Sequence, residues 1–362
     1  MGSGREREMT KHKVWRNILP LALMGLLITG GFSCNLIGPH NPSGPDTTSS
    51  NFTFQTYTFG GNAGGCLLND VTIVNDTDIW AVGMIYLDSA DGNPDITPYN
   101  AVHWNGKAWS IPRIEFHTIC GQSHMGSYPI SSVYSFAPDD IWFSDAGEMV
   151  HWTGSQYEND CSIGSQISGA INRVWGTSLT NLYVVGNNGT ILHYSNSNWV
   201  KLASGTTTDI NDAWGVGNSP VYCAVSNSFD PNEEKRILKI TNGTKVDTVS
   251  WVGREVSSVW TPDGTHLYAC GDGVFENDGG GWKEMVTGAS IYTNCIRGNG
   301  TDDIVVVGGG FGFIAHWNGA HWKTFTPMTD VIYTRVAMKG NLIVAVGNSA
   351  TSEQAVITVG SR

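Results

Sequence analysis

Charged residues are scarce in this sequence, and positive charge is the scarcer kind. Asp, Glu, Lys and Arg make up 14% of the 362 residues, with 20 Lys and Arg against 32 Asp and Glu. The formal net charge of −12 argues against nucleic acid as a partner, because phosphate backbones select basic surfaces. Scarce charge together with 45 Gly and 14 Trp indicates a turn-rich all-β chain rather than a two-domain enzyme with helices.

One apolar run stands out near the amino terminus, ILPLALMGLLITGG at 18–31. It follows the basic stretch MTKHKVWRN, which begins at Met9, and it is short for a membrane span. This order predicts a secretory signal peptide over residues 1–33. An alternative is that translation starts at Met9, so that the signal peptide begins there. Small residues before Cys34 favour the lipoprotein type, in which Cys34 becomes lipidated, and ordinary secretion is the alternative.

A flexible tether is predicted over residues 34–50, which are rich in Pro, Gly, Ser and Thr. Loss of residues 1–33 removes five Lys and Arg and two Glu, so the net charge of the mature chain becomes −12 − 3 = −15. The mature chain is therefore more acidic still, and we expect it to contact a membrane only through the lipid anchor.

The remainder of the chain repeats one strand pattern seven times. The second apolar strand of each repeat begins at Ile79, Ile141, Leu182, Val221, Leu267, Ile304 and Ile343. Six intervals span 264 residues, so the period is about 44. Such a period with strands inside it predicts a β-propeller with one four-stranded sheet per blade. We predict seven blades, and six or eight are the less favoured counts.

The seventh repeat has no fourth strand of its own before Arg362. The segment NFTFQTYTF at 51–59 alternates in the same way as KTFTPM after Trp322, and we expect it to supply the missing strand. Joining both ends of the chain in one blade closes the ring and removes exposed sheet edges. A single propeller domain is therefore predicted over residues 51–362, as a monomer.

A ring of polar residues is predicted at the central channel. Each first strand has a packing residue 7 to 9 positions before the second strand: Val71, Val133, Val174, Ala213, Val259, Cys295 and Val336. The residue before each of these is polar: Asp70, Ser132, Arg173, Asp212, Ser258, Asn294 and Arg335. Because side chains alternate along a strand, we expect this ring to face water in the channel. Its Arg and Asp residues could hold an anionic or sugar-like ligand, and a self-neutralising, water-filled rim is the alternative.

Two long loops, 84–100 and 114–127, are expected to overhang the face on which the first strands begin, beside blades 1 and 2. The first loop holds hard oxygen ligands of the calcium type without the spacing of an EF-hand loop: Asp88, Asp91, Asn93 and Asp95. The second holds metal-type ligands without a fourth partner: His117, Cys120 and His124. Plain surface loops are the favoured interpretation, so neither a metal nor a cofactor is predicted.

Besides the lipidation candidate, six cysteines remain, an even number that permits disulfides in an exported protein. Cys223, Cys270 and Cys295 fall within repeat strands and are expected to be small buried side chains. Cys120 and Cys161 lie in or beside the loops that flank the second repeat. They are the pair for which we predict a disulfide.

Catalytic motifs are lacking. VGGGFG at 307–312 has no following Lys-Ser/Thr, and neither a nucleophile elbow nor a close carboxylate pair can be assigned. Four histidines recur at one third-strand position, which indicates a structural role: His103, His151, His193 and His316.

The segments AVG, VGNNGTILHY and W, in this order across the repeats, resemble bacterial propellers related to the photosystem II assembly factor and to sialidase and sortilin-type repeats. The resemblance covers residues 52–360 and implies a fold more than an activity. Sialidase-type members carry a Ser-x-Asp-x-Gly-x-Thr-Trp box where this chain reads SNSNW, NGKAW or NGAHW. Of the Arg triad that a sialidase needs, only Arg173 and Arg335 fall on the ring.

These observations favour a non-enzymatic, exported propeller, lipid-anchored in the cell envelope and facing the periplasm or the cell surface, that binds an envelope protein or a glycan. Two alternatives stay open. One is an exported glycan-active enzyme with its site at the central channel, using carboxylates such as Asp70 and Asp212. The other is a purely structural envelope component.

Overall fold

The computed structural model describes residues 47–362, apart from residues 63, 94, 228–231, 233 and 289–291. The proposed signal peptide, the lipidation candidate Cys34 and most of the tether lie outside the described residues. Among the residues that are described, no helix is long and apolar enough to cross a bilayer.

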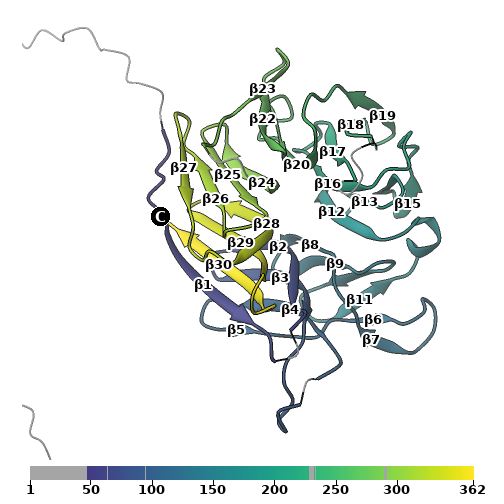
Figure 1. The fold of residues 1–362 in the computed structure, drawn as a ribbon. Coiled ribbons are helices and arrows are strands. Elements are labelled where there is room, and N and C mark those ends of the chain that lie inside the picture. Colours follow the sequence, from purple (N-terminus) through teal and green to yellow (C-terminus); the bar gives the residue numbers. More distant parts are fainter. Residues whose placement is uncertain (1–46, 63, 94, 228–231, 233, 289–291) are drawn as a thin grey trace, which may run out of the picture. The chain divides into compact units, whose positions relative to one another are not determined.

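Seven four-stranded antiparallel sheets make up the domain (Figure 1). Blades 1 to 3 are β2–β5 (Leu67–Asn75, Asp78–Ile85, Tyr99–Trp104, Trp109–Ser110), β8–β11 (Ser132–Ala137, Asp140–Ser144, Met149–Trp152, Tyr157–Asp160) and β12–β15 (Ile171–Ser178, Asn181–Gly186, Thr190–Ser195, Asn198–Lys201). Blades 4 to 6 are β16–β19 (Ile210–Trp214, Val221–Val225, Arg236–Thr241, Lys245–Val249), β20–β23 (Val256–Trp260, Leu267–Gly271, Gly273–Asn277, Trp282–Glu284) and β24–β27 (Thr293–Gly300, Asp303–Gly308, Ile314–Trp317, Trp322–Phe325). Blade 7 contains β28 (Val331–Lys339), β29 (Leu342–Ser349) and β30 (Ala355–Ser361). The predicted seven-bladed β-propeller is confirmed.

Two small elements lie outside the blades. A two-stranded ribbon, β6 (Glu115–His117) and β7 (Met125–Ser127), follows blade 1, and the short helix η1 (Gly164–Gln166) follows blade 2. Both belong to connections between blades, where insertions leave the sheets undisturbed.

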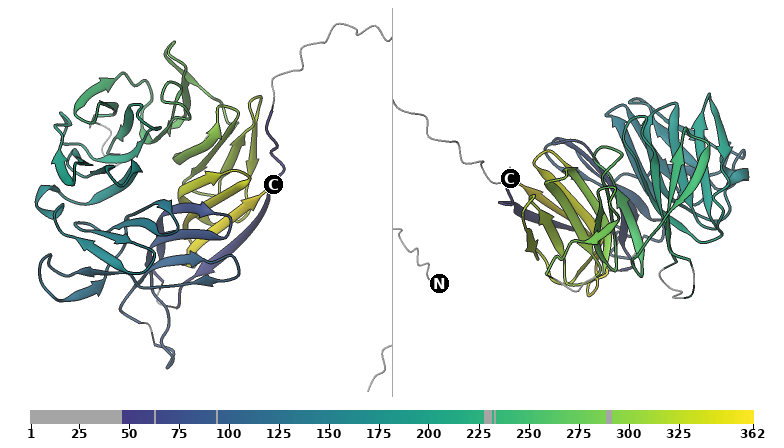
Figure 2. Two further views of the ribbon diagram at one scale, coloured as in Figure 1. Left: turned by 180° about the vertical axis from the view of Figure 1, so that it is seen from behind. Right: turned by 90° about the horizontal axis from the view of Figure 1, so that it is seen from above.

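The fourth strand of blade 7 comes from the other end of the described chain. β1 (Thr53–Phe59) pairs antiparallel with β30, from Thr53 opposite Ser361 to Phe59 opposite Ala355. The purple β1 therefore runs beside the yellow β30 in both Figure 1 and Figure 2. Blade 7 has the order β1-β30-β29-β28, so the predicted closure by residues 51–59 is confirmed.

The first strands form the inner ring of the propeller. Each contacts the first strand of the next blade, and β28 contacts β2, which completes the circle. In six of the seven blades the pairing with the second strand shifts by one residue directly before the ring position of the first strand, a β-bulge. The extra residues are Asn69, Asn172, Asn211, Ser257, Asn294 and Thr334.

Several bulge residues link their blade to the next one. Asn69 Nδ2 donates to the backbone oxygen of Ile130 in the connection to blade 2 at 2.9 Å. Thr334 Oγ1 donates to the backbone oxygen of Leu68 at 2.6 Å, and this bond links blade 7 to blade 1 in a similar way. Because these bonds join one blade to the next, they supplement the pairing within each blade.

Apolar side chains between neighbouring blades form the core. Between blades 2 and 3, for example, Met149 packs in one cluster with Val174 and Leu182, all fully buried. Burial of one such side chain stabilises a protein by about 1.5–3 kcal/mol. Contacts of this kind, rather than strand pairing, hold one blade against the next, because the ladders lie within the blades.

The four third-strand histidines fasten the third strand to the start of the second. In blade 1, His103 stacks on Trp80 with ring centroids 4.0 Å apart, and its Nε2 lies 2.9 Å from Asp78 Oδ1. The equivalent contacts in blades 2, 3 and 6 are His151 with Asp140, His193 with Asn181 and His316 with Asp303.

A polar clasp fastens the two ends of the described chain to blade 6. The Arg362 guanidinium donates to both oxygens of Asp303, at 3.0 and 2.6 Å, and to the backbone oxygen of Ser49 at 2.6 Å. His316 bridges Asp303 at 2.7 Å and Ser50 Oγ at 2.7 Å. Burial raises the pKa of Asp303, but its hydrogen bonds to His316 and Arg362 outweigh burial and lower that pKa to about 2.

Phe52, directly before β1, packs inside this clasp. It is 7% exposed, with its ring centroid 5.1 Å from His316 and 4.9 Å from the Arg362 guanidinium. We expect Phe52→Ala to lower the free energy of unfolding by about 3–5 kcal/mol in urea titrations, because it leaves a cavity at the closure. Ile96→Ala, at a side chain that is 89% exposed, is the control and should change it by less than about 0.5 kcal/mol. Equal effects of the two substitutions would show that this segment does not fasten the ring.

Candidate functional site

The predicted ring residues lie on the inner strands, each opposite an equivalent residue of the second strand, with one correction. In blade 6 the residue at the ring position is Cys295, opposite Val307, and not Asn294. Asn294 is the bulge residue, and its Nδ2 donates to the backbone oxygen of Tyr333 at 2.7 Å. The prediction was wrong because Cys295 and Ile296 are both apolar, so the polar and apolar pattern did not fix which of them packs between blades.

The expectation that the ring faces water is also wrong for most of its members. Five are buried, with 0–4% exposure: Asp70, Ser132, Arg173, Asp212 and Ser258. Asn294 and Arg335 are half-buried. Neighbouring inner strands lie so close that these polar side chains bond to one another across the blades instead of to water.

Asp70, Ser132 and Arg173, from blades 1, 2 and 3, form a first polar triad. Ser132 Oγ donates to Asp70 Oδ2 at 2.6 Å, and the backbone N–H of Val133 donates to the same oxygen at 3.0 Å. Arg173 Nη1 donates to Asp70 Oδ1. Ser132 Oγ in turn accepts the backbone N–H of Val174 at 3.0 Å. One carboxylate thus joins three consecutive blades.

A second triad repeats this arrangement in blades 4, 5 and 6. Ser258 Oγ donates to Asp212 Oδ2 at 2.5 Å, and the backbone N–H of Val259 donates to it at 3.2 Å. Arg297 binds Asp212 in a bidentate manner, at 2.9 and 3.0 Å. Sequence reasoning missed Arg297 because it lies two residues beyond the ring position. The recurring order Asp, Ser, Arg is the signal that could have found it.

The two triads meet through Arg173. Its Nε lies 3.5 Å from Asp212 Oδ1, an ion pair without a hydrogen bond. Burial alone raises the pKa of Asp212, but the charges of Arg297, Arg173 and Arg335 lower it to about 2. Asp212 is therefore ionised at neutral pH. Arg335 donates to the backbone oxygen of Asn211 at 2.8 Å.

A cavity of about 200 Å³ lies beside this network. Its lining comes mostly from the later halves of the inner strands, including residues 71–73 and 336–339. The long loop 84–100 follows the end of β3, which pairs with the start of β2. The cavity therefore lies toward the end of the inner strands away from that loop, and not on the loop-bearing face.

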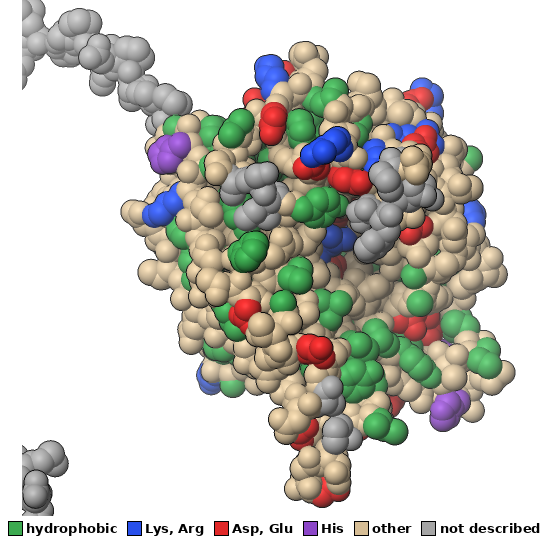
Figure 3. Space-filling view, in the orientation of Figure 1, with side chains coloured by type: hydrophobic (Ala, Val, Ile, Leu, Met, Phe, Trp, Pro, Cys, Tyr) green, Lys and Arg blue, Asp and Glu red, His purple; other side chains and the backbone are tan. Residues whose placement is uncertain are grey.

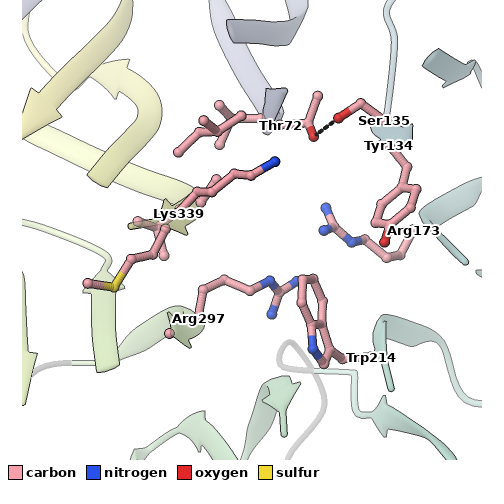
Figure 4. A pocket seen from close by; sticks show the side chains of 13 residues that line it. Thr72, Tyr134, Ser135, Arg173, Trp214, Arg297 and Lys339 are labelled. Carbon is pink, nitrogen blue, oxygen red and sulfur yellow. Dashed lines mark hydrogen bonds between the residues drawn. The ribbon is translucent and has the colours of Figure 1, made fainter. Parts of the chain in front are cut away.

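Cationic and aromatic side chains point into this cavity (Figure 4). The Arg297 guanidinium lies over the Trp214 ring at 4.5 Å, and Lys339 Nζ donates to the backbone oxygen of Val74 at 2.8 Å. Burial raises the pKa of Tyr134 to about 12, so its hydroxyl stays protonated at neutral pH and can donate.

The described residues that line the cavity contribute three cationic side chains, Arg173, Arg297 and Lys339, and no carboxylate. On one wall Thr72 Oγ1 and Ser135 Oγ are hydrogen-bonded to each other at 2.7 Å. Such a site can bind an anionic group and pack an apolar or aromatic group against its rings.

The four calcium-type ligands of the first long loop do not converge: Asp88 and Asp95 turn to other residues, and Asp91 bonds to Asn93. Asp88 accepts hydrogen bonds from Asn62, Asp91 accepts them from Asn93, and Asp95 pairs with Arg113 at 2.5 Å. The loop projects from the propeller, and carboxylates are visible at its tip in Figure 3. Among the described residues these side chains do not gather around a common point.

In the second long loop, Cys120 forms a disulfide with Cys161, and their Cα atoms lie 5.4 Å apart. His117 contacts Glu148, whereas His124 is exposed on the same loop. The thiols of Cys66, Cys223, Cys270 and Cys295 are free and buried. Burial raises the pKa of Cys223 and Cys270, so both are protonated.

Solved structures with this fold include "YCF48 bound to D1 peptide", at 14% identity and a TM-score of 0.62, covering 85% of this chain and 97% of that one. The WD40 β-propeller domain of Doa1 is 17% identical, with a TM-score of 0.58 and coverage of 86% and 97%. A catalytically inactive virginiamycin B lyase from Staphylococcus aureus with quinupristin is 10% identical, with a TM-score of 0.59 and coverage of 85% and 99%. No family model and no curated protein matches the chain. At these identities the likeness establishes the fold alone.

Asp212→Asn tests the central network. The substitution leaves Arg297 buried without its counter-charge, so we expect the free energy of unfolding at pH 7 to fall by about 3–5 kcal/mol. The pKa of Asp212 in the folded protein, about 2, lies below the ordinary 3.8. Its contribution is therefore complete above the ordinary value and is lost as pH falls from about 4 to 2, a loss on the order of 2 kcal/mol.

Denaturant titrations between pH 7 and pH 2 measure both effects. The variant should lose less stability than the wild type in the acid range, because it has no carboxylate to protonate. Asp76→Asn, at an exposed position in a turn, is the matched control and should behave as the wild type does. An unchanged acid profile in Asp212→Asn would contradict the assigned pairing.

Proposed function

We propose that this protein is an exported β-propeller, held at the cell envelope by a lipid on Cys34, that binds an anionic segment of a protein partner. The cavity beside the central network is the proposed site. The observation that carries the proposal is the lining of this cavity, which sets Arg173, Arg297 and Lys339 beside Tyr134 and Trp214.

Charge at the propeller centre favours an anion. Three arginines of the network, Arg173, Arg297 and Arg335, face the two carboxylates of Asp70 and Asp212, and Lys339 at the cavity adds a further positive charge. The centre thus carries an excess of positive charge within a chain whose net charge is −12. Screening by water is weak beside buried groups, so this excess attracts a negatively charged group.

A peptide supplies the two kinds of group that the cavity can bind. A carboxylate, from an acidic side chain or a free carboxyl terminus, can accept a hydrogen bond from the ammonium group of Lys339, beside the polar wall that Arg173 and Arg297 form. An apolar side chain next to it can pack on Trp214 and Tyr134. The solved propellers of the same fold include one bound to a peptide, which supports a protein partner over a glycan.

The glycan-active alternative needs a carboxylic acid with a raised pKa near the channel. Asp70 and Asp212 are both held in ion pairs with arginine, and the pKa of Asp212 is lowered to about 2. An ionised, fully bonded carboxylate is a poor general acid. The geometry therefore favours binding over hydrolysis at this site.

Export and anchoring rest on the leader: a basic stretch, an apolar run and small residues before Cys34. We expect Cys34→Ser to move the protein, expressed in a bacterium with a lipoprotein pathway, from the detergent phase to the aqueous phase on phase separation. Mass spectrometry should at the same time show that the acyl groups are lost. Equal partitioning of wild type and variant would contradict the anchor.

Lys339→Ala tests the cavity, because this side chain is exposed and lies outside the buried triads. The probe is a fluorescein-labelled, Glu-rich decapeptide with a free carboxyl terminus, read by fluorescence anisotropy on the full chain. We expect saturable binding that weakens with salt, and a Kd about five- to tenfold higher in the variant, as one charged contact is lost.

Lys283→Ala is the matched control, since Lys283 is exposed on the outer strand β23, away from the cavity lining. It should leave the Kd unchanged, and a Lys-rich decapeptide should not bind. If the Glu-rich peptide binds equally to both variants, the site lies elsewhere. If no labelled peptide binds, a purely structural envelope component becomes the better interpretation.

A further inference from the structure

The second long loop is fastened to blade 2 away from the cavity. This loop contains the ribbon of β6 and β7, which lies beside the outer strand β11 (Figure 1), where Asn159 Nδ2 donates to the backbone oxygen of Glu115 at 3.2 Å. Cys161 follows β11, and Glu148 lies at the turn between β9 and β10. Three separate segments therefore meet at this corner of the propeller.

Four side chains gather where these segments meet. The ligand atoms of His117, Cys120, Glu148 and Cys161 all lie within 4.8 Å of one another. His117 Nδ1 is 2.6 Å from Glu148 Oε1, and Cys161 Sγ is 3.5 Å from that oxygen and 3.6 Å from Nδ1. This is the one such group found among the described residues.

Glu148 is held ready for this contact. It is 2% exposed, and its Oε2 accepts the backbone N–H of His117 at 2.8 Å. Asp145 Oδ1 accepts the backbone N–H groups of Gly147 and Glu148, at 2.8 and 2.7 Å, which fixes the turn. A carboxylate buried in this way is expensive to desolvate unless a cation or strong donors face it, and here it faces an imidazole and two sulfurs.

We propose that, after reduction of the Cys120–Cys161 disulfide, the two freed thiolates bind one Zn²⁺ ion together with His117 and Glu148. Two cysteines, one histidine and one carboxylate are ligands that Zn²⁺ accepts, and four ligands complete its tetrahedral shell. With no position left open, the ion serves to fix the loop to blade 2 and does no catalysis.

The separations in the structure suit this ion. Zinc bonds of about 2.0–2.3 Å place tetrahedral ligand atoms about 3.3–3.8 Å apart. The distances from Cys161 Sγ to its two neighbours already lie in that range, while the His117–Glu148 pair must open by less than about 1 Å. The two sulfurs must also part, and Cα atoms 5.4 Å apart allow this through side-chain rotation.

The reaction balances with a dithiol as reductant. The dithiol gives two electrons and two protons to the disulfide, which yields the thiols of Cys120 and Cys161 and a cyclic disulfide of the reductant. Zn²⁺ then displaces both thiol protons and takes the lone pair of His117 Nδ1 and the Glu148 carboxylate. The disulfide and the metal are mutually exclusive fasteners of the same loop.

Cobalt substitution on the full chain tests the proposal. After reduction with dithiothreitol and its removal without air, we expect the protein to bind one equivalent of Co²⁺ with the visible and near-ultraviolet bands of tetrahedral thiolate coordination. Zn²⁺ should displace the Co²⁺ and erase these bands. The oxidised protein should show none of them, and neither should Cys120→Ser/Cys161→Ser, which keeps the four buried thiols.

Single substitutions distinguish the proposed metal ligands from nearby residues that do not bind the metal. Loss of an outer-shell partner weakens metal binding by about 10- to 100-fold, so Glu148→Gln and His117→Ala should weaken it by at least about 100-fold. His124→Ala, on the same loop, is the matched control and should bind as the wild type does. Metal uptake by the double cysteine variant equal to that of the wild type, or no uptake by the reduced wild type, would overturn the proposal.

A measurement on the unsubstituted protein tests the site even if the variants fail to fold. Zn²⁺ should slow the alkylation of Cys120 and Cys161 in the reduced protein, read peptide by peptide in a mass spectrometer. Alkylation rates that Zn²⁺ leaves unchanged at both cysteines would equally overturn the site.

Discussion

Charge buried at the centre of the propeller has to be paired, and this requirement fixes how the blades meet. Each carboxylate of the network bonds to groups from the next two blades, so Asp70 and Asp212 are satisfied only when three consecutive blades stand in register. Apolar contacts between blades are non-directional and tolerate sliding. An ion pair of this kind adds little net stability compared with apolar residues, yet breaking it is costly. Its contribution is therefore to select one arrangement of the ring.

Closure of the propeller ring also depends on directional polar contacts, here at the outer edge of blade 7. β1 removes the open edge of blade 7 by pairing along its whole length with β30, and the clasp around Asp303 holds the segment before it. Between neighbouring blades, Asn69 carries the polar contact from blade 1 toward blade 2, and Thr334 carries it from blade 7 to blade 1. Hydrophobic burial supplies most of the favourable energy, while these polar contacts decide which neighbours meet.

The repeat pattern in the sequence was enough to predict seven blades and the strand that completes the last, because period and alternation are local properties. The surroundings of the ring residues could not be predicted in this way. A β-bulge adds one residue without disturbing an apolar run. The sequence pattern therefore assigned the ring position of blade 6 to Asn294, whereas Cys295 occupies it. Whether Asp212 meets water or Arg297 depends on how the chain folds between two residues that are 85 positions apart in the sequence. His117 and Glu148 likewise share no spacing motif, because loop packing alone brings them together.

The two candidate sites differ in their relation to the central network: the cavity is built on it, and the cysteine corner of blade 2 lies outside it. At the cavity, Arg173 and Arg297 are already committed to carboxylates, so they provide a rigid, polarised wall, and Lys339 carries the charge that is left for a ligand. At the corner of blade 2, no inner strand takes part, and the disulfide closes 41 residues at the periphery. Replacement of the disulfide by a bound Zn²⁺ ion therefore leaves the central network intact. A redox change can alter the loop without unfolding the propeller, because the charges that fix the blades lie elsewhere.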